Sequence, residues 1–209
     1  MRAHSALIGT AALVAVGLLT AAAYKPDPSA SAMPSGTYVL DPHHASLLVK
    51  VRHQGFSLYT LRFTGLDAGF SYDPAHPDAT KLGVKVATAS IDTATGADPF
   101  GKAFNAELLA ADWLDGKQFP TITFNSTSVD VGDGHTGKIT GDLTLHGVTK
   151  PVTLAVTFNG SGKGIPGGET RAGFSGTATI KRSDFGVTKY VPVIGDEVQL
   201  TIEAEFQKK

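Results

Sequence analysis

Two polar side chains continue rows of residues that are otherwise apolar, and they are the first candidates for chemistry. His53 extends the alternation of Val49 and Val51, and Arg182 extends the alternation that begins at Phe174. Residues two apart share one face of a strand, so both side chains are expected to point inward at strand ends. His53 would be either a hydrogen-bonded structural histidine or a contact for the polar head of a ligand.

Arg182 raises a sharper question, because a buried guanidinium is costly unless it is paired. One interpretation is an internal salt bridge with the carboxylate of Asp184, Asp196 or Glu197. The other is contact with an anionic group on a ligand.

Other sources of chemistry find little support. The 209 residues include no cysteine, and no G-x-S-x-G motif supplies a serine nucleophile. The segment GADPFGKA resembles a phosphate-binding loop, but it has Ala103 where that loop needs a hydroxyl, and Pro99 removes one backbone N–H. His43 and His44 are adjacent and would point to opposite sides of an extended chain. We therefore predict no catalytic residue, no metal site and no cofactor.

A two-residue period of apolar side chains runs along most of the chain and predicts an all-β barrel or sandwich. The segment GDLTLHGVTKPVTL, from Gly141, reads as a β-hairpin with its turn between Gly147 and Pro151. Beyond Gly65 the apolar phase shifts by one residue, as a glycine bulge in a bent barrel strand would produce. The pattern predicts eight or nine strands in antiparallel order, because long crossover helices are lacking.

One short helix is expected where the alternation breaks, between residues 91 and 119. Phe100, Phe104 and Leu108 recur at four-residue spacing after Asp98, a plausible N-cap. The helix would pack on the barrel as core or act as a mobile lid over its mouth.

The first 23 residues have the form of a signal peptide, with Arg2, an apolar run of about 14 residues and a small-residue cleavage site. An uncleaved anchor is the alternative, although the run is shorter than the ~18 to 20 residues that suit a bilayer. Residues 24–36 are rich in Pro, Ser and Ala and predict a flexible tether, followed by one domain over residues 37–209. The mature protein would be periplasmic or secreted, without an integral membrane domain.

The charge balance argues against nucleic acid as a partner. The chain has 18 basic and 19 acidic residues, and loss of the leader removes Arg2 and leaves a net charge of about −2. A homodimer stays open, since a closed barrel has no free edge strands and would need an exposed patch.

Five segments, in order, carry a resemblance to a known family. They are LDPHHASLLVKVRHQG from Leu40, NAELLAADWLDGKQFPTITF from Asn105, GDLTLHGVTKPVTL from Gly141, IKRSDFGV from Ile180 and IGDEVQLTIEAEF from Ile194. With them the chain resembles the YceI-like family of exported polyisoprenoid-binding proteins. The resemblance implies an extended, lipocalin-like barrel of eight antiparallel strands whose apolar lumen accepts an isoprenoid lipid or isoprenoid quinone. It also implies a carrier or binder, not an enzyme.

The predicted ligand-binding residues are those that the alternation places on the inner face. They are Val49, Val51, His53, Tyr59, Leu61, Phe63, Phe70, Ile122, Phe124, Leu143, Leu145, Phe174, Ile180, Arg182, Leu200 and Ile202. An eight-stranded barrel is close to the size at which side chains either fill the lumen or leave room for one slender ligand. The alternatives are therefore a filled barrel that serves as an interaction module, and a small enzyme that uses an inward polar pair.

Overall fold

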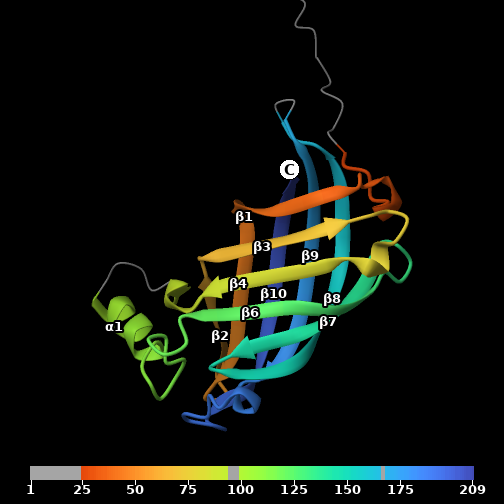
Figure 1. Ribbon diagram of the computed structural model, residues 1–209. Helices are drawn as coiled ribbons and strands as arrows, with labels where there is room; N and C mark the ends of the chain where they lie inside the picture. Colours follow the sequence, from red (N-terminus) through yellow and green to blue (C-terminus); the bar gives the residue numbers. More distant parts are fainter. Residues whose placement is uncertain (1–24, 94–98, 166–167) are drawn as a thin grey trace, which may run out of the picture.

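One antiparallel sheet curls until its first long strand meets its last (Figure 1). The computed structural model describes residues 25–93, 99–165 and 168–209. The strands are β1 (Gly36–His53), β2 (Ser57–Phe63), β3 (Leu66–Tyr72), β4 (Lys81–Ala87), β5 (Ile91–Asp92), β6 (Thr121–Asp130), β7 (Thr136–Leu145), β8 (Val148–Lys163), β9 (Thr170–Lys181) and β10 (Ile194–Lys208). They pair in the order β10-β9-β8-β7-β6-β4-β3-β1-β2-β5, and the pairing of β10 with β1 closes the ring. The predicted all-β barrel is confirmed.

The barrel counts as eight-stranded because β2 and β3 act as one bent strand. Both pair with β1, β2 along its second half, where Leu47 faces Phe63, and β3 along its start, where Gly36 faces Tyr72. The two-residue β5 adds only to the edge of β2. With β2 and β3 counted together, the closed barrel has the eight antiparallel strands that were expected.

Gly65 marks the bend between β2 and β3, as the shift of apolar phase predicts. The strand pattern stops at Phe63 and resumes at Leu66. A Cβ at Gly65 would lie 2.9 Å from the Cβ of Ser90, closer than real Cβ atoms come, and 3.0 Å from that of Ala87, which is also tight. Glycine is therefore required where the wall folds over the β4–β5 connection.

The β7–β8 hairpin is tighter than the sequence predicts. Leu145 pairs with Val148, so the turn consists of His146 and Gly147 alone, with φ of 52° and 75°. Two central residues with positive φ match the twist of the flanking strands. The predicted turn from Gly147 to Pro151 is wrong, because Pro151 lies inside β8 opposite Asp142. 

The short helix is present as α1 (Pro99–Leu108). Leu108 is buried, and Phe104 packs edge-on against Tyr59 at 5.7 Å between ring centroids. Phe100 does not share in this packing, because its side chain is 68% exposed. The expected apolar stripe is thus shorter by one turn.

An aromatic cluster occupies the barrel end that holds the C-terminus. Tyr38 is fully buried and stacks on Phe70 at 5.1 Å, and Phe206 meets Phe70 edge-on at 4.9 Å. The 3₁₀ turn η1 (Ala30–Ala32) leads into Met33, which is buried against this cluster. The described part of the segment predicted as a tether therefore packs on the barrel, which follows from the apolar contact that Met33 finds there.

Two predictions fall outside the described residues, namely the signal peptide over residues 1–23 and the helix N-cap at Asp98. Within the described ranges, no helix has both the length and the apolar composition needed to cross a bilayer.

Candidate functional site

The barrel interior contains two adjoining apolar cavities. The upper cavity, toward the C-terminal end of the barrel in Figure 1, has a volume of about 230 Å³ and is lined by residues including Phe70, Phe158, Phe174 and Phe206. The lower cavity, toward the end that carries α1, has a volume of about 470 Å³. Both share part of their walls, formed by Leu47, Val84, Val86, Leu154 and Ile202. The lumen is therefore hollow, with a neck of aliphatic side chains between its two halves.

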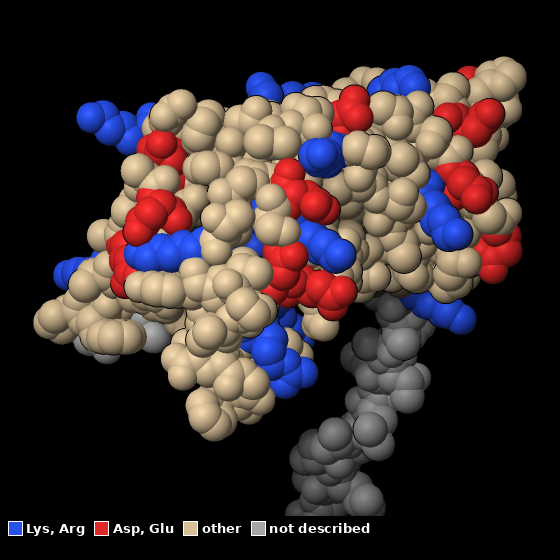
Figure 2. Space-filling model, turned by 90° about the horizontal axis from the view of Figure 1, so that it is seen from below, with Lys and Arg blue, Asp and Glu red and all other residues tan. Residues whose placement is uncertain are grey.

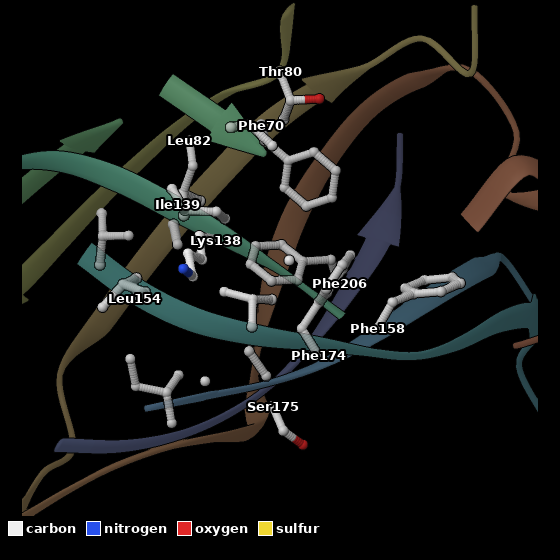
Figure 3. A pocket seen from close by; sticks show the side chains of 18 of the residues that line it. Phe70, Thr80, Leu82, Lys138, Ile139, Leu154, Phe158, Phe174, Ser175 and Phe206 are labelled. Carbon is white, nitrogen blue, oxygen red and sulfur yellow. The ribbon is translucent and has the colours of Figure 1, made fainter. Parts of the chain in front are cut away.

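The upper cavity has two kinds of wall. Figure 3 shows the rings of Phe70, Phe174 and Phe206 on one side and the aliphatic Leu82, Ile139 and Leu154 on the other. These side chains come from six different strands, which the closed sheet brings to one space. Such a surface offers dispersion contacts and almost no polar recognition.

All sixteen predicted site residues line one of these cavities. Phe70 and Phe174 line the upper cavity, Ile202 lies at the neck and lines both, and the others line the lower cavity. The two-residue alternation thus placed the fifteen strand residues on the inner face, and Arg182, the first residue of η4, lines the cavity as well. Their role in binding a ligand stays a prediction.

Several lining residues were missed. Met33 lies in the predicted tether, and Tyr190 and Val193 lie in the irregular loop before β10, where no periodicity marks an inner face. The two-residue period could have identified Ile139, because it is in phase with Leu143 along β7.

Arg182 begins the 3₁₀ turn η4 (Arg182–Phe185) near the mouth of the lower cavity, and its side chain is 6% exposed. The guanidinium donates to four backbone carbonyls: Nε to Gly195 (2.9 Å), Nη1 to Val187 (3.0 Å), and Nη2 to Lys189 (2.8 Å) and Ile194 (2.9 Å). The Cζ atom of the guanidinium lies over the ring of Trp113, 5.5 Å from its centroid.

The internal salt bridge predicted for Arg182 is wrong. Among the described residues, no carboxylate lies within ion-pair distance of it. Asp196 instead accepts hydrogen bonds from the backbone N–H and the hydroxyl of Ser183, at 2.9 and 2.7 Å, and these bonds lower the pKa of Asp196. Burial lowers the pKa of Arg182, although the charge of Asp196 opposes this. Carbonyl dipoles, not a counter-ion, satisfy the buried cation.

His53 ends β1 and lines the lower cavity beside Gln54. Its ring lies 6.3 Å from that of Tyr59, whose hydroxyl donates to the carbonyl of Thr93. Within the described part of the chain, the His53 ring has no hydrogen-bond partner. It is therefore free to bind a polar group that enters the lower cavity.

A cluster around Lys189 ties α1 and the turn after it to the loop before β10. The Lys189 ammonium lies 2.6 Å from Asp112 and 3.5 Å from Glu107, and it sits over the rings of Trp113 and Tyr190 at 5.4 and 5.2 Å. The bond to Lys189 lowers the pKa of Asp112 and raises that of Lys189. These contacts hold one side of the lower cavity's mouth in place.

At the opposite end, the buried Asp41 organises a polar cluster where β1 is bulged. Its carboxylate accepts hydrogen bonds from the His43 N–H (3.0 Å), His44 Nδ1 (2.8 Å), Arg171 (2.8 Å) and Gln207 (2.8 Å). His44 is thus committed to a structural contact. The described residues contain no group of three or more His, Asp or Glu side chains placed to hold a metal ion.

These bonds hold the pKa of Asp41 well below its usual range, and the bond from His44 contributes most. A carboxylate with a lower pKa in the folded state stabilises the fold above its unfolded pKa of about 3.9, and this stabilisation is lost as the pH falls further. We expect Asp41→Asn to lower the free energy of unfolding by about 2 to 3 kcal/mol at neutral pH. Below about pH 4 the difference in free energy of unfolding between wild type and Asp41→Asn should narrow by up to ~1.4 kcal/mol per pH unit.

Urea unfolding of both proteins across this pH range is the measurement. Asp67→Asn, an exposed change on β3, is the control and should leave stability within about 0.5 kcal/mol. A gap that stays constant from neutral to acid pH would contradict the role given to the Asp41 charge.

Comparison with known proteins agrees with this architecture. The sequence model of the YceI-like domain matches residues 38–206. Curated relatives include a UPF0312 protein of Ectopseudomonas mendocina, 42% identical over 171 residues (80% of this chain, 85% of the relative), and one of Pseudomonas putida, 41% identical over 180 residues (86% and 83%).

Solved structures show the same fold. BcnA of Burkholderia cenocepacia superposes with a TM-score of 0.69 at 26% identity, covering 79% of this chain and 98% of BcnA. A Campylobacter jejuni YCEI protein gives 0.64 at 31% identity, with 74% and 87% covered. A polyisoprenoid binding domain from Saccharophagus degradans, at 15% identity, gives 0.59 with 82% and 98% covered, and it bears on the fold alone. The chain belongs to the family of proteins with a YceI-like domain.

Proposed function

We propose that this protein holds one long isoprenoid, a polyprenyl phosphate or an isoprenoid quinone, in its lumen and carries or stores it outside the cytoplasm. The observation that carries the proposal is the hollow, almost entirely apolar lumen formed by the upper and lower cavities. Ile194 lines the lower cavity and Phe206 the upper, twelve residues apart on β10, which corresponds to roughly 40 Å of strand. A long and slender ligand fits this shape.

The tail is expected to supply most of the affinity. Burial of ~10 tail carbons contributes roughly 8 kcal/mol gross at about 0.8 kcal/mol per CH₂. A single charge-assisted hydrogen bond at the head contributes ~1.5 to 3 kcal/mol. The solved Saccharophagus degradans domain, which shares the fold, is described as polyisoprenoid binding.

His53 is the residue best placed to select the head group, because its ring lines the wider cavity and neither ring nitrogen has a hydrogen-bond partner among the described residues. We expect His53→Ala to weaken binding of a prenyl phosphate or quinone by about 10- to 100-fold, the loss of one such bond. Affinity for a prenyl hydrocarbon without a head group should change little. Equilibrium binding of the three ligands measures this, and an equal loss for all three would show that His53 only packs against the tail.

Native mass spectrometry of the protein purified from its own exporting host tests the function directly. A stoichiometric isoprenoid in the extract, bound to a chain that lacks residues 1–23, is the expected result. A protein without ligand that also fails to take up added prenyl lipids would overturn the carrier function. Recovery in the cytoplasmic fraction would overturn export.

A further inference from the structure

Large hydrophobic side chains are exposed on three separate segments at the lower end of the barrel. They form what we term the apolar rim: Phe56 (86% exposed), Leu58 (43%), Phe100 (68%), Tyr190 (58%) and Val193 (61%). Figure 1 shows that α1, the β1–β2 turn and the loop before β10 all lie at this end. Clusters of exposed apolar side chains on a soluble barrel indicate an interaction surface.

Direct contacts show that these segments meet. The backbone N–H of Gln54, in the β1–β2 turn, donates to the carbonyl of Val193 at 3.0 Å. Tyr190 packs against Trp113, just beyond α1, at 6.0 Å between ring centroids. Phe100 follows on α1, 6.1 Å from Phe104.

Two members of the rim border the opening of the lower cavity. Tyr190 and Val193 line that cavity, yet more than half of each side chain is exposed. The cavity wall therefore continues without interruption into the outer surface. Phe104, next to the exposed Phe100, lines the same cavity from α1.

Charge does not identify an acidic partner for this end. Figure 2, which views the molecule from below, shows Lys and Arg interspersed with Asp and Glu, with no broad region of one sign. Two cations at this end are already engaged, Lys189 with Asp112 and Arg182 with backbone carbonyls. Attraction at this surface must come from its apolar side chains.

We propose that the apolar rim inserts into the surface of a phospholipid bilayer and brings the mouth of the lower cavity to the level of the acyl chains. A bilayer accepts separate apolar side chains at different heights, and aromatic side chains suit its interface. A protein partner would need one continuous complementary surface, and it would seal the cavity that opens at the rim. A bilayer instead joins that cavity to hydrocarbon. Docking is measured on vesicles without isoprenoid, so it stands or fails independently of the lumen ligand.

The chain has no cysteine, which allows a single reporter to be placed at will. An environment-sensitive fluorophore on Ser57→Cys, an exposed position beside Phe56, should shift to the blue and brighten when phosphatidylcholine vesicles are added. The same fluorophore on Ala75→Cys, in the exposed turn after β3 at the far end, should not respond. High salt should leave the response unchanged, because apolar insertion is not screened.

Phe56→Ser combined with Val193→Ser should lower the vesicle-bound fraction by at least about tenfold. The matched control is Ile165→Ser, which removes a side chain that is 77% exposed beyond the other end of the barrel and should leave binding unchanged. Phe56, Val193 and Ile165 are all exposed, so the double variant and the control should both fold. No response at Ser57, loss of binding at high salt, or equal loss with the control would overturn the proposal. So would a vesicle-independent response that grows with protein concentration, which would assign the rim to a second copy of the chain.

Discussion

Replacing Leu200 by tryptophan is expected to lower affinity for an isoprenoid about a thousand-fold while the barrel stays folded. Leu200 lines the lower cavity from β10, between Val49 on β1 and Ala178 on β9. Residue 200 lies on the lumen face of β10, so the indole ring projects into the cavity. Displacement of about five tail carbons removes roughly 4 kcal/mol of burial, which corresponds to about three powers of ten in affinity.

The matched control is Gln199→Trp, the preceding residue on β10, whose side chain is exposed on the outer face. It adds the same ring to the same strand without entering the lumen. Binding is measured by titration calorimetry, and urea unfolding shows whether the larger core side chain costs stability, for which about 1 to 3 kcal/mol is usual. Equal affinities of both variants would place the ligand outside the lower cavity.

The inner face of the barrel was predictable because a strand has a period of two residues. Once Val49 and Val51 are assigned to one face, every second side chain follows, and pairing of neighbouring strands turns these faces to one space. Gly65 was predictable for a related reason, since a shift of phase within an apolar run requires a break in the strand. These are local properties, and the sequence contains them in full.

Features that depend on irregular backbone were not predictable. Arg182 continues the phase of β9, but η4 begins at this residue, so its partners are backbone carbonyls of the loop before β10 and of the first residues of β10, and not side chains of the next strand. Tyr190 and Val193 belong to that loop, and no period assigns them to the mouth of the cavity. The exposure of Phe100 also escaped, because spacing along a helix does not show how far the barrel surface extends beneath it.

The cluster around Asp41 shows a third limit. Its members Arg171 and Gln207 come from β9 and β10, and they reach Asp41 only because β10 closes the ring against β1. His44 reaches the same carboxylate from three residues further along the chain, across the bulge in β1, a contact that the adjacent histidine pair does not reveal. Long-range pairing decides the role of Arg171 and Gln207, and irregular backbone decides that of His44.

Arg182→Met is expected to lower the free energy of unfolding by about 3 to 5 kcal/mol, because it leaves four backbone carbonyls, two in the loop before β10 and two at the start of β10, without their donor. Water near the mouth will satisfy part of this loss, which keeps the figure below the sum of four buried groups. Urea unfolding measures it, and Lys181→Met, an exposed change on the preceding residue, should cost less than about 0.5 kcal/mol.

Ligand binding separates this structural role from the alternative, in which Arg182 contacts an anionic head group. A guanidinium that only shapes the mouth affects every ligand that passes it, so Arg182→Met should weaken binding of a prenyl phosphate and of the matching prenyl alcohol by the same factor. A loss confined to the phosphate would show that the remaining N–H of Arg182 binds the anion. Because four of its five donors are already engaged with carbonyls, the structure favours an equal loss, and the charge of Arg182 would then serve the loop and not the ligand.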